Sequence, residues 1–287
     1  LNYHDNQGIV KETDYNRLQA RINSEYSFWD NKLTVGENLT LSKGRETPMP
    51  EGLGGSPLWL ALISQPILPV HTEDGGWAGP VGSGFDDRDN PVRLLKHNRW
   101  DNNQIFRSFG NLFADVDVYE NLTFSTKVGV DYTEFYARDI QRTYQSGFLT
   151  RDLNSLTTTE NHTINWSWSN TLTYNLDVAK HSTQVMGGME LVSNTYDHLS
   201  TYQDDFAIES KNYFFNDSGT GETNNTGNRT GYSLMSYFGK INYDYDGRYL
   251  VSATLRYDGS SRFGEENRFG FFPAFSAGWR ISKEQFI

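Results

Sequence analysis

The chain has 287 residues, no cysteine, a net charge of -11 and an aromatic content of 15%. The lack of cysteine excludes a disulfide framework, a thiolate nucleophile and a cysteine-based zinc site, and the acidic balance argues against nucleic acid as a partner, since phosphate binding needs clustered Lys and Arg. No apolar run approaches the roughly 18 residues of a membrane-spanning helix, whereas a barrel strand crosses a membrane with about 10 tilted residues.

Nine segments of the chain alternate apolar residues with polar or small ones. Side chains on a strand point to opposite sides in turn, so this pattern predicts strands that have one apolar and one polar face. In the eighth segment, for example, Val251 and Leu255 alternate with Ser252 and Thr254. The predicted strands are about 11 to 15 residues long, against a usual length of about five or six. They lie within residues 17–28, 33–42, 106–118, 122–133, 163–174, 184–191, 235–245, 249–258 and 269–281.

Short and long connections alternate between these strands. Tight turns are predicted at 29–31, 119–121, 177–180 and 246–247, and long segments at 46–102, 137–161, 196–231 and 259–268. Outer-membrane barrels show this alternation, with the turns on the periplasmic side and the loops outside the cell. The longest loop holds a short apolar stretch, Pro57 to Ile63, which predicts that this loop is folded and functional. Residues 219–228 are polar and rich in glycine, and we expect a mobile loop there.

The pattern predicts an all-β fold, an antiparallel transmembrane β-barrel with long extracellular loops. Alternation by itself leaves an alternative open, a soluble β-rich carbohydrate-binding or carbohydrate-active module, because it does not say which face meets water. Three features favour the barrel: strands long enough for a tilted membrane crossing, alternating connection lengths, and aromatic residues near strand ends. A soluble sandwich is expected to have shorter strands and connections of mixed length.

Two stretches match motifs of a known family. Residues 258–264 read D-G-S-S-R-F-G, and residues 272–280 follow the pattern F-P-x-x-S-A-x-W-R. In the long loop, residues 57–62 (PLWLAL), 73–77 (EDGGW) and 90–92 (NPV) match a long extracellular segment of the same family. On these residues the chain resembles the SusC/RagA-type TonB-dependent outer-membrane transporters of Bacteroidetes. The motif residues are Asp258, Gly259, Ser260, Ser261, Arg262, Phe263, Gly264, Phe272, Pro273, Trp279 and Arg280.

The resemblance implies that residues 1–287 are part of a transporter barrel, about nine strands of a larger barrel of roughly 22 strands. The N-terminal extension, the plug with its TonB box and the remaining strands are expected to be absent from the chain. The implied localisation is the Gram-negative outer membrane, where the barrel contacts outer-membrane lipid.

The function that the resemblance implies is active import of large nutrients, with oligosaccharides as the first expected cargo and peptides as the second. The implied partners are a SusD-like surface lipoprotein that covers the barrel and the TonB–ExbB–ExbD complex, which acts through the plug. Neither an enzyme activity nor a cofactor is implied.

Three tryptophans in or beside the long loop are candidate substrate-binding residues: Trp59, Trp77 and Trp100. An exposed indole can stack on a sugar ring, but aromatic residues more often serve packing and interfaces, so both interpretations stay open. Trp166 and Trp168 share the parity of Ile164, which predicts that they face lipid in a membrane-interface belt.

The sequence offers only weak signals for a metal site or for catalysis. Asp86, Asp87 and Asp89 form an oxygen-rich cluster of the kind that binds Ca²⁺, but they lack the spacing of a known calcium loop, so a solvated acidic loop is the alternative. The six histidines show no metal-ligand spacing. Nothing fixes a facing pair of carboxylates for glycoside hydrolysis.

The loop after Asp258 carries two arginines, Arg262 and Arg268. Either could meet an anionic group, but acidic residues lie within the same loop. We therefore expect the two arginines to pair with Asp258, Glu265 or Glu266.

Overall fold

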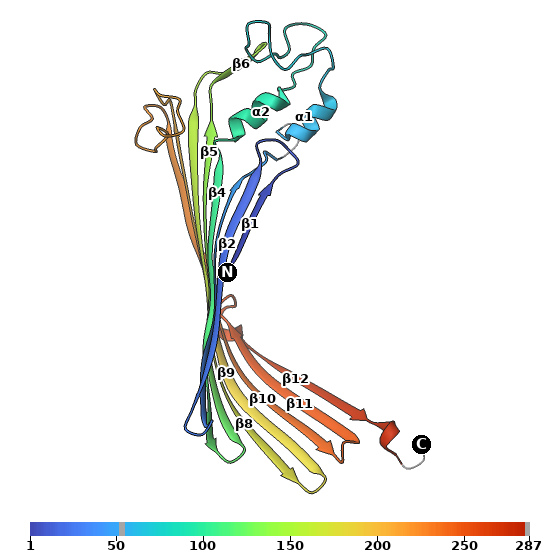
Figure 1. Ribbon diagram of the computed structural model, residues 1–287. Helices are drawn as coiled ribbons and strands as arrows, with labels where there is room; N and C mark the ends of the chain where they lie inside the picture. The colour runs from blue at the N-terminus through green and yellow to red at the C-terminus, as the bar shows by residue number, and fades with distance from the viewer. Residues whose placement is uncertain (52–54, 285–287) are drawn as a thin grey trace.

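One curved antiparallel sheet makes up most of the molecule (Figure 1). The computed structural model describes residues 1–51 and 55–284. Ten strands follow each other across the sheet in chain order. They are β1 (Asn2–Gln7), β2 (Asp14–Phe28), β3 (Leu33–Thr47), β4 (Asn102–Tyr119), β5 (Leu122–Gln141), β8 (Ser155–Val178), β9 (His181–Asp204), β10 (Thr223–Tyr245), β11 (Tyr249–Ser260) and β12 (Phe269–Trp279).

The remaining elements are short and lie in the connections. The β3–β4 connection holds helices α1 (Pro57–Ile63) and α2 (Pro91–Asn98), and the β5–β8 connection holds a hairpin of β6 (Tyr144–Ser146) and β7 (Leu149–Arg151). Two 3-10 helices, η1 (Glu265–Asn267) and η2 (Ile281–Lys283), follow β11 and β12. Among the described residues, none of the helices has both the length and the apolar character needed to span a membrane.

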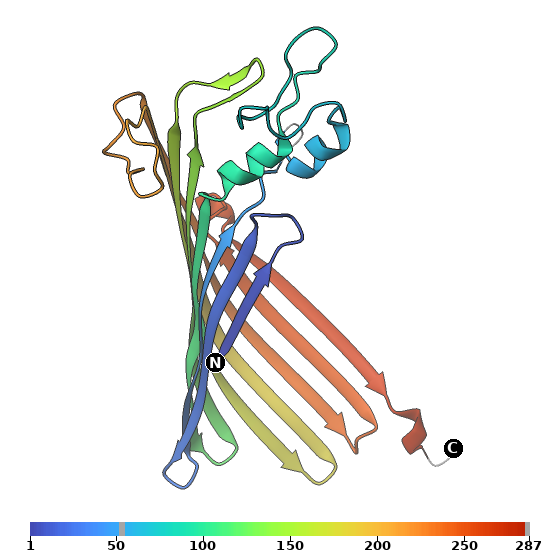
Figure 2. The same cartoon turned by 45° about the horizontal axis from the view of Figure 1, so that its top comes forward.

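Tight turns gather at one end of the sheet, and the three longest connections gather at the other (Figures 1 and 2). Left-handed backbone conformations close the turns, with φ of 67° at Asn31, 61° at Asn121, 55° at Asp246 and 64° at Gly247. Asn, Asp and Gly adopt this conformation at low cost, which is why the sequence reveals these turns. The predicted alternation of turns and loops is confirmed.

All nine predicted strands are present, and most are longer than predicted. β8 and β9 have 24 residues each, so much of the predicted loops 137–161 and 196–231 is in fact strand. The expected mobile loop at 219–228 is wrong from Thr223 onward, because β10 begins there. The outer parts of these strands have no continuous apolar face. Their pairing rests on backbone hydrogen bonds, which alternation of side chains does not report.

A tenth strand, β1, lies outside the sequence prediction. It pairs with β2 over six residues, from Asn2 opposite Gln19 to Gln7 opposite Asp14. All six side chains are exposed, and Tyr3 is the one large apolar residue among them, so no alternation marks the strand. Within the described residues, β1 and β12 are the two edges of the sheet.

The two faces of the sheet differ in chemistry. Large apolar side chains lie exposed on one face of the sheet, strand after strand, and Leu112, Val130, Trp168, Leu255 and Phe275 are examples; in a barrel this is the outer, convex face. The concave face carries amide, hydroxyl and charged side chains that pair across strands. Such a continuous exposed apolar surface needs an apolar surrounding, which a lipid bilayer provides. The predicted transmembrane β-barrel fold is confirmed, and the soluble module is disfavoured.

The apolar surface forms a band of membrane height. On β8 the outward-facing apolar side chains run from Ile164 to Tyr174. His162, a polar residue, lies just beyond Ile164 on the same face. Ten residues of a strand tilted by about 40° rise about 25 Å, the height of the lipid-facing band of such barrels. Trp166 and Trp168 face outward as predicted, each 40% exposed, but they lie within the band, two and four residues from its upper end.

The buried hydrophobic core is small and lies at the loop end of the molecule. Ile140 of β5, Leu156 of β8, and Phe206 and Phe214 of the β9–β10 connection form one cluster, and Trp100 packs against it. The two phenylalanine rings are 4.6 Å apart. A barrel wall one sheet thick has no interior of its own, so compact packing occurs where connections fold onto strand ends.

Candidate functional site

Rows of polar side chains cross the concave face of the sheet. The Asn38 amide on β3 donates to Asn111 on β4 at 3.3 Å, and the Asn194 amide on β9 donates to Asn165 on β8 at 2.6 Å. Each pair stands directly opposite in the strand register. Period-two alternation places these residues on the face away from lipid, and the cross-strand pairs make that face polar.

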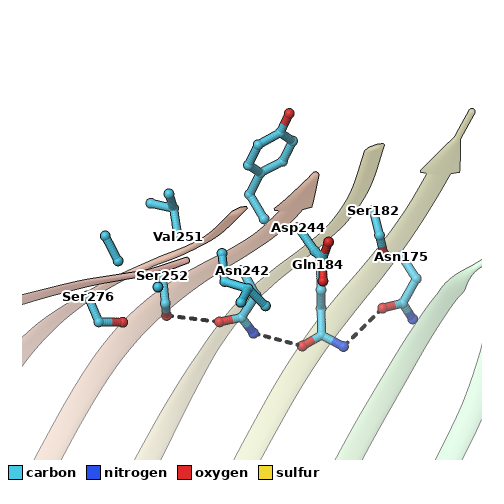
Figure 3. A pocket seen from close by; sticks show the side chains of 12 residues that line it. Asn175, Ser182, Gln184, Asn242, Asp244, Val251, Ser252 and Ser276 are labelled. Carbon is cyan, nitrogen blue, oxygen red and sulfur yellow. Dashed lines mark hydrogen bonds between the residues drawn. The ribbon is translucent and has the colours of Figure 1, made fainter. Parts of the chain in front are cut away.

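One such row lines a cavity of about 520 Å³ near the turn end of the wall (Figure 3). The Ser252 hydroxyl donates to Asn242 at 2.9 Å, Asn242 donates to Gln184 at 3.2 Å, and Gln184 donates to Asn175 at 3.0 Å. The chain of hydrogen bonds thus crosses β11, β10, β9 and β8. Ser276 extends the lining onto β12. Every amide in the row keeps free donors or acceptors, so the surface can bind hydroxyl groups or peptide amides.

The β3–β4 connection is folded at the opposite, loop end of the wall. Asn90 organises it: its side-chain oxygen accepts the N–H groups of Val92 and Arg93 at 3.1 Å each, which caps α2. The Asn90 amide nitrogen donates to the carbonyls of Val70 and Ala78, both at 2.9 Å. One side chain therefore joins the helix to two turns of the loop. The expectation of a folded loop is confirmed.

Arginine and aromatic side chains join this loop to the β6–β7 hairpin. The Arg93 guanidinium is buried and lies 3.4 Å from the centre of the Tyr144 ring, and its Nε donates to Asp89 at 3.1 Å. Arg142, just before the hairpin, stacks over Trp100 at 4.1 Å. We call the described residues of the β3–β4 connection with α1 and α2, the β5–β8 connection with its hairpin, and the β9–β10 connection together the extracellular rim.

Two ionisable groups within the rim are held uncharged near neutral pH. Burial raises the pKa of Asp101 to about 8, with Asp139 adding to the rise, and its carboxyl oxygen accepts the N–H of Ile140 at 2.8 Å. Burial lowers the pKa of His97 to about 4, and the nearby Arg93 lowers it further. Sequence reasoning missed both residues, since their burial depends on contacts between segments far apart in the chain.

The three candidate tryptophans occupy different surroundings in the rim. Trp77 packs against the His71 ring at 4.6 Å and meets His97 edge-on at 6.3 Å. Trp100 meets Phe214 edge-on at 6.2 Å. Trp59 on α1 is 44% exposed. Packing accounts for Trp77 and Trp100, whereas Trp59 has an indole face available to a ligand; substrate binding by any of the three stays a prediction.

The acidic cluster of the long loop is spread over separate contacts. Asp89 binds Arg93, and an Asp87 oxygen lies 4.0 Å from Arg88 Nε. Within residues 1–51 and 55–284, no three His, Asp or Glu side chains are grouped to hold a metal ion. The calcium site at Asp86, Asp87 and Asp89 therefore has no geometric support and stays a prediction.

The first family motif builds a tight loop between β11 and β12. Asp258 accepts hydrogen bonds from Nε and Nη2 of Arg256, at 3.3 and 3.1 Å. A Cβ on Gly259 would lie 2.4 Å from the Phe269 ring, so glycine lets that ring close over the strand. The Ser260 N–H donates to the Arg268 carbonyl at 2.9 Å, and the Ser261 N–H donates to Ser233 on β10 at 2.9 Å. Gly264 caps η1.

The arginines of this loop make other contacts than expected. Arg262 stacks over the Tyr232 ring at 4.5 Å, and Arg268 donates to the Phe263 carbonyl at 3.4 Å. The predicted pairing of both with Asp258, Glu265 or Glu266 is wrong, because Asp258 is already bound by Arg256 on its own strand.

The second motif supports β12 and its lower end. Phe272 lies over Gly270, whose Cβ would be 3.0 Å from the ring, and Pro273 stands opposite Leu255 in the register of β11 and β12. Trp279 stacks with Tyr249 at 6.4 Å and donates to Glu284 at 3.0 Å. The Arg280 N–H donates to the Arg248 carbonyl at 2.8 Å. The motif residues therefore have structural roles in the wall.

No protein-family model matches the chain. Among curated proteins, it is 28% identical over 312 residues to the TonB-dependent receptor SusC of Bacteroides thetaiotaomicron, covering 100% of this chain and 30% of that protein. It is 27% identical over 298 residues to the TonB-dependent receptor P26 of Formosa agariphila, covering 100% of this chain and 29% of that protein. The chain thus spans about 30% of the length of the curated relatives that it matches.

Among solved structures, a structure of the RagAB peptide transporter matches with a TM-score of 0.81 at 20% identity, over 99% of this chain and 32% of that chain. The RagAB peptide importer in its open-open state matches with a TM-score of 0.77 at 21% identity. At these identities the likeness concerns the fold. It places the whole curved sheet, with its rim, in the wall of a barrel of this kind.

Proposed function

We propose, on the premise that the chain is a barrel segment of a SusC/RagA-type TonB-dependent transporter, that it forms part of the wall of an outer-membrane nutrient importer. The observation that carries the proposal is one continuous sheet with an apolar band outside and hydrogen-bonded amide rows inside. Such a wall separates lipid from a polar lumen. The work of this segment is to enclose and to bind, and its residues take part in no covalent step.

Oligosaccharides are the cargo class that we propose. The lumenal row of Asn175, Gln184, Asn242 and Ser252 is neutral and offers amides and hydroxyls, which suit the hydroxyl groups of sugars. Trp59 offers an exposed ring on the rim for stacking. Peptides are the second candidate, because amide rows also bind peptide backbone and because the matching RagAB structures are described as those of a peptide transporter.

The proposed partners act at opposite ends of the wall. A SusD-like surface lipoprotein would contact the extracellular rim, where Leu58, Trp59 and Leu62 leave apolar surface exposed on α1. The TonB–ExbB–ExbD complex would act from the periplasmic side through a plug domain inside the barrel. The lumenal row near the turns provides a polar surface against which such a domain can rest.

The test is uptake by cells that carry the full-length transporter as their sole copy. Labelled oligosaccharides and labelled peptides of matched length are supplied in turn, and accumulation is measured with and without TonB. We expect TonB-dependent accumulation of oligosaccharide. Accumulation of peptide alone would make peptides the cargo class in place of oligosaccharides. Accumulation of both without TonB would contradict the proposal of a TonB-dependent importer.

A further inference from the structure

Four cationic side chains converge on the outer side of the extracellular rim. Arg45 on β3 and Arg138 on β5 belong to the sheet, Arg99 follows α2, and Lys211 lies in the β9–β10 connection. This connection lies on the convex side of the sheet, across from α1 and α2 (Figures 1 and 2). We call these four residues the basic rim cluster.

The strand register shows that Arg45 and Arg138, the two sheet members of the cluster, face outward, immediately above the lipid-facing band. On β3, Leu41, Lys43 and Arg45 follow each other on the same face, and Leu41 and Lys43 are exposed. At about 3.3 Å per residue on a tilted strand, Arg45 lies about 10 Å beyond Leu41, at the level of lipid headgroups. Lys43 stands between them, where a lysine can keep its stem in the apolar layer and its ammonium above it. On β5, Arg138 shares the parity of Val130.

The members of the cluster are close to each other. Arg45, Arg99 and Lys211 line one cavity of about 650 Å³, whose other charged lining residues are Lys11, Asp5, Glu12 and Asp14. Arg138 reaches the same region, since its guanidinium donates to the carbonyl of Phe214 in the connection that carries Lys211. Burial lowers the pKa of Lys211, and the charges of Arg45, Arg138 and Arg99 lower it further, with Asp14 opposing.

The positive charge of the cluster is only partly compensated. Arg45 Nε donates to the neutral amide of Asn102 at 3.0 Å, and Asp14 is engaged by the Thr47 N–H at 3.1 Å. In the part of the chain that the structure describes, no member of the cluster forms a salt bridge. The cavity lining adds one more cation, Lys11, and holds three carboxylates, Asp5, Glu12 and Asp14, of which Glu12 is already paired with Lys96, in a chain whose net charge is -11. Like charges held together in this way favour binding of a multivalent anion.

We propose that the basic rim cluster is a binding site for the phosphate of an outer-leaflet lipid headgroup. Guanidinium groups bind phosphate with paired hydrogen bonds, and a lysine adds a point charge. The apolar band directly below holds the acyl chains of the same lipid, so headgroup and chains are bound on one vertical strip of β3 to β5. The inference rests on the proposed function, because it requires this band to lie in the outer membrane. Inorganic phosphate has the same anionic chemistry and is the competing source.

The experiment titrates the full-length transporter in neutral detergent with a phosphorylated glycolipid, with its dephosphorylated form and with inorganic phosphate, and counts bound molecules by native mass spectrometry. The test variant is Arg45→Gln with Lys211→Gln. The matched control is Lys127→Gln with Lys240→Gln, which removes two cations from the concave face. The difference in electrophoretic mobility between unheated and heated samples checks that each variant is folded.

We expect the phosphorylated lipid to bind, the dephosphorylated lipid to bind at least about tenfold more weakly, and the test variant to lose the same factor while the control does not. Equal binding of both lipids, or unchanged binding by the test variant, would overturn the site. Saturation by inorganic phosphate that prevents lipid binding would overturn the lipid assignment and leave a free-anion site. If lipid binding is intact but no uptake is measured, the proposed import function is contradicted and the lipid site is not.

Discussion

The membrane-facing wall and the extracellular rim are stabilised in different ways. In the wall, Val251 and Leu255 are 50% and 44% exposed, and lipid serves as their apolar surrounding. In the rim, Phe214 is 0% exposed, and the protein supplies the surrounding itself. Apolar side chains of the wall are surrounded by lipid, and apolar side chains of the rim are surrounded by other segments of the chain.

This difference has consequences for binding. The wall repeats one pattern from strand to strand, so each polar row resembles its neighbours, and no single residue distinguishes one ligand from another. The rim joins segments far apart in sequence through single side chains such as Asn90 and Arg93. We therefore expect the rim to select among ligands, and the wall to provide the surface along which they pass.

The largest effect is expected when the rim core loses a ring. Replacing Phe214 with Ala removes a fully buried side chain that packs on Phe206 and Trp100, and comparable losses cost about 3 to 5 kcal/mol. Hydrogen exchange of the β9–β10 connection in the intact transporter measures the loss. Exchange in β10 and β11 near the turns should stay unchanged, and a uniform loss across the sheet would contradict a separate rim.

A charge on the lipid side of the wall comes next. Leu255→Arg is expected to destabilise the barrel in lipid by about 2 to 4 kcal/mol, while Thr254→Arg on the concave face is tolerated. Urea unfolding of the transporter in vesicles compares the two. Similar midpoints for both variants would defeat the assignment of faces.

Close strand contact at a glycine gives a smaller effect. A Cβ on Gly110 of β4 would lie 2.3 Å from the Asn38 carbonyl oxygen, whereas a Cβ on Gly187 of β9 meets no atom closer than 4.0 Å. Gly110→Ala is therefore expected to cost about 1 to 3 kcal/mol through overpacking. Gly187→Ala serves as the control in the same unfolding assay. A cost at Gly187 equal to that at Gly110 would exclude the contact as the cause.

The stability of the rim is expected to depend on pH through Asp101. Because the pKa of Asp101 is about 8 in the folded rim against a usual 3.8, its contribution is complete below pH of about 4 and is lost as pH rises through 8. Asp101→Asn keeps an oxygen that can accept the Ile140 N–H and removes this loss. Hydrogen exchange of Ile140 should show the variant better protected than the wild type at pH 9, by on the order of 1 to 2 kcal/mol.

At pH 4 the wild type and Asp101→Asn should be equally protected, because Asp101 is then protonated and uncharged in the folded rim. His97 is present in both proteins and affects them equally. A variant that is less protected than the wild type at pH 9 would mean that the carboxylate stabilises the rim, and the assignment of a neutral Asp101 would be wrong.

The smallest structural effect is expected at Trp59. Its indole is 44% exposed, so Trp59→Ala should leave folding unchanged, while oligosaccharide binding weakens by about 1 kcal/mol if the ring stacks on sugar. Isothermal titration of the transporter measures both stoichiometry and affinity. Trp77→Ala, which removes a packed ring, should instead loosen the rim. Unchanged affinity in Trp59→Ala would remove this residue from the candidate site.

The wall could be predicted from the sequence because its rules are local. Alternation at Val251 and Leu255 follows from the period of a strand, and the turns at Asn121 and Gly247 follow from backbone preferences. The strands predicted from alternation end near the loop-side limit of the lipid-facing band, whereas β8, β9 and β10 continue beyond it. Above it, strand residues meet water on both sides, so neither β1 nor the outer half of β10 carries an alternation to detect.

The rim could not be predicted in the same way, because its contacts join distant segments. Asp101 becomes neutral only when the folded rim excludes water from it and β5 brings Asp139 near, which together raise its pKa against the opposing effect of the Ile140 N–H. The basic rim cluster draws on β3, β5, the end of α2 and the β9–β10 connection, so its four charges are separated by up to 166 positions between Arg45 and Lys211. No spacing rule in the sequence brings these residues together.

The environment of successive residues on β11 in the intact transporter tests the assignment of the two faces of the wall. Single spin labels are placed at positions 251 to 255 in a background without other reactive cysteines, and their accessibility to oxygen and to a water-soluble nickel chelate is measured in vesicles. We expect oxygen contact at Val251, Ala253 and Leu255, and nickel contact at Ser252 and Thr254. Equal accessibility at all five positions, or the opposite alternation, would contradict a wall with lipid on its apolar face.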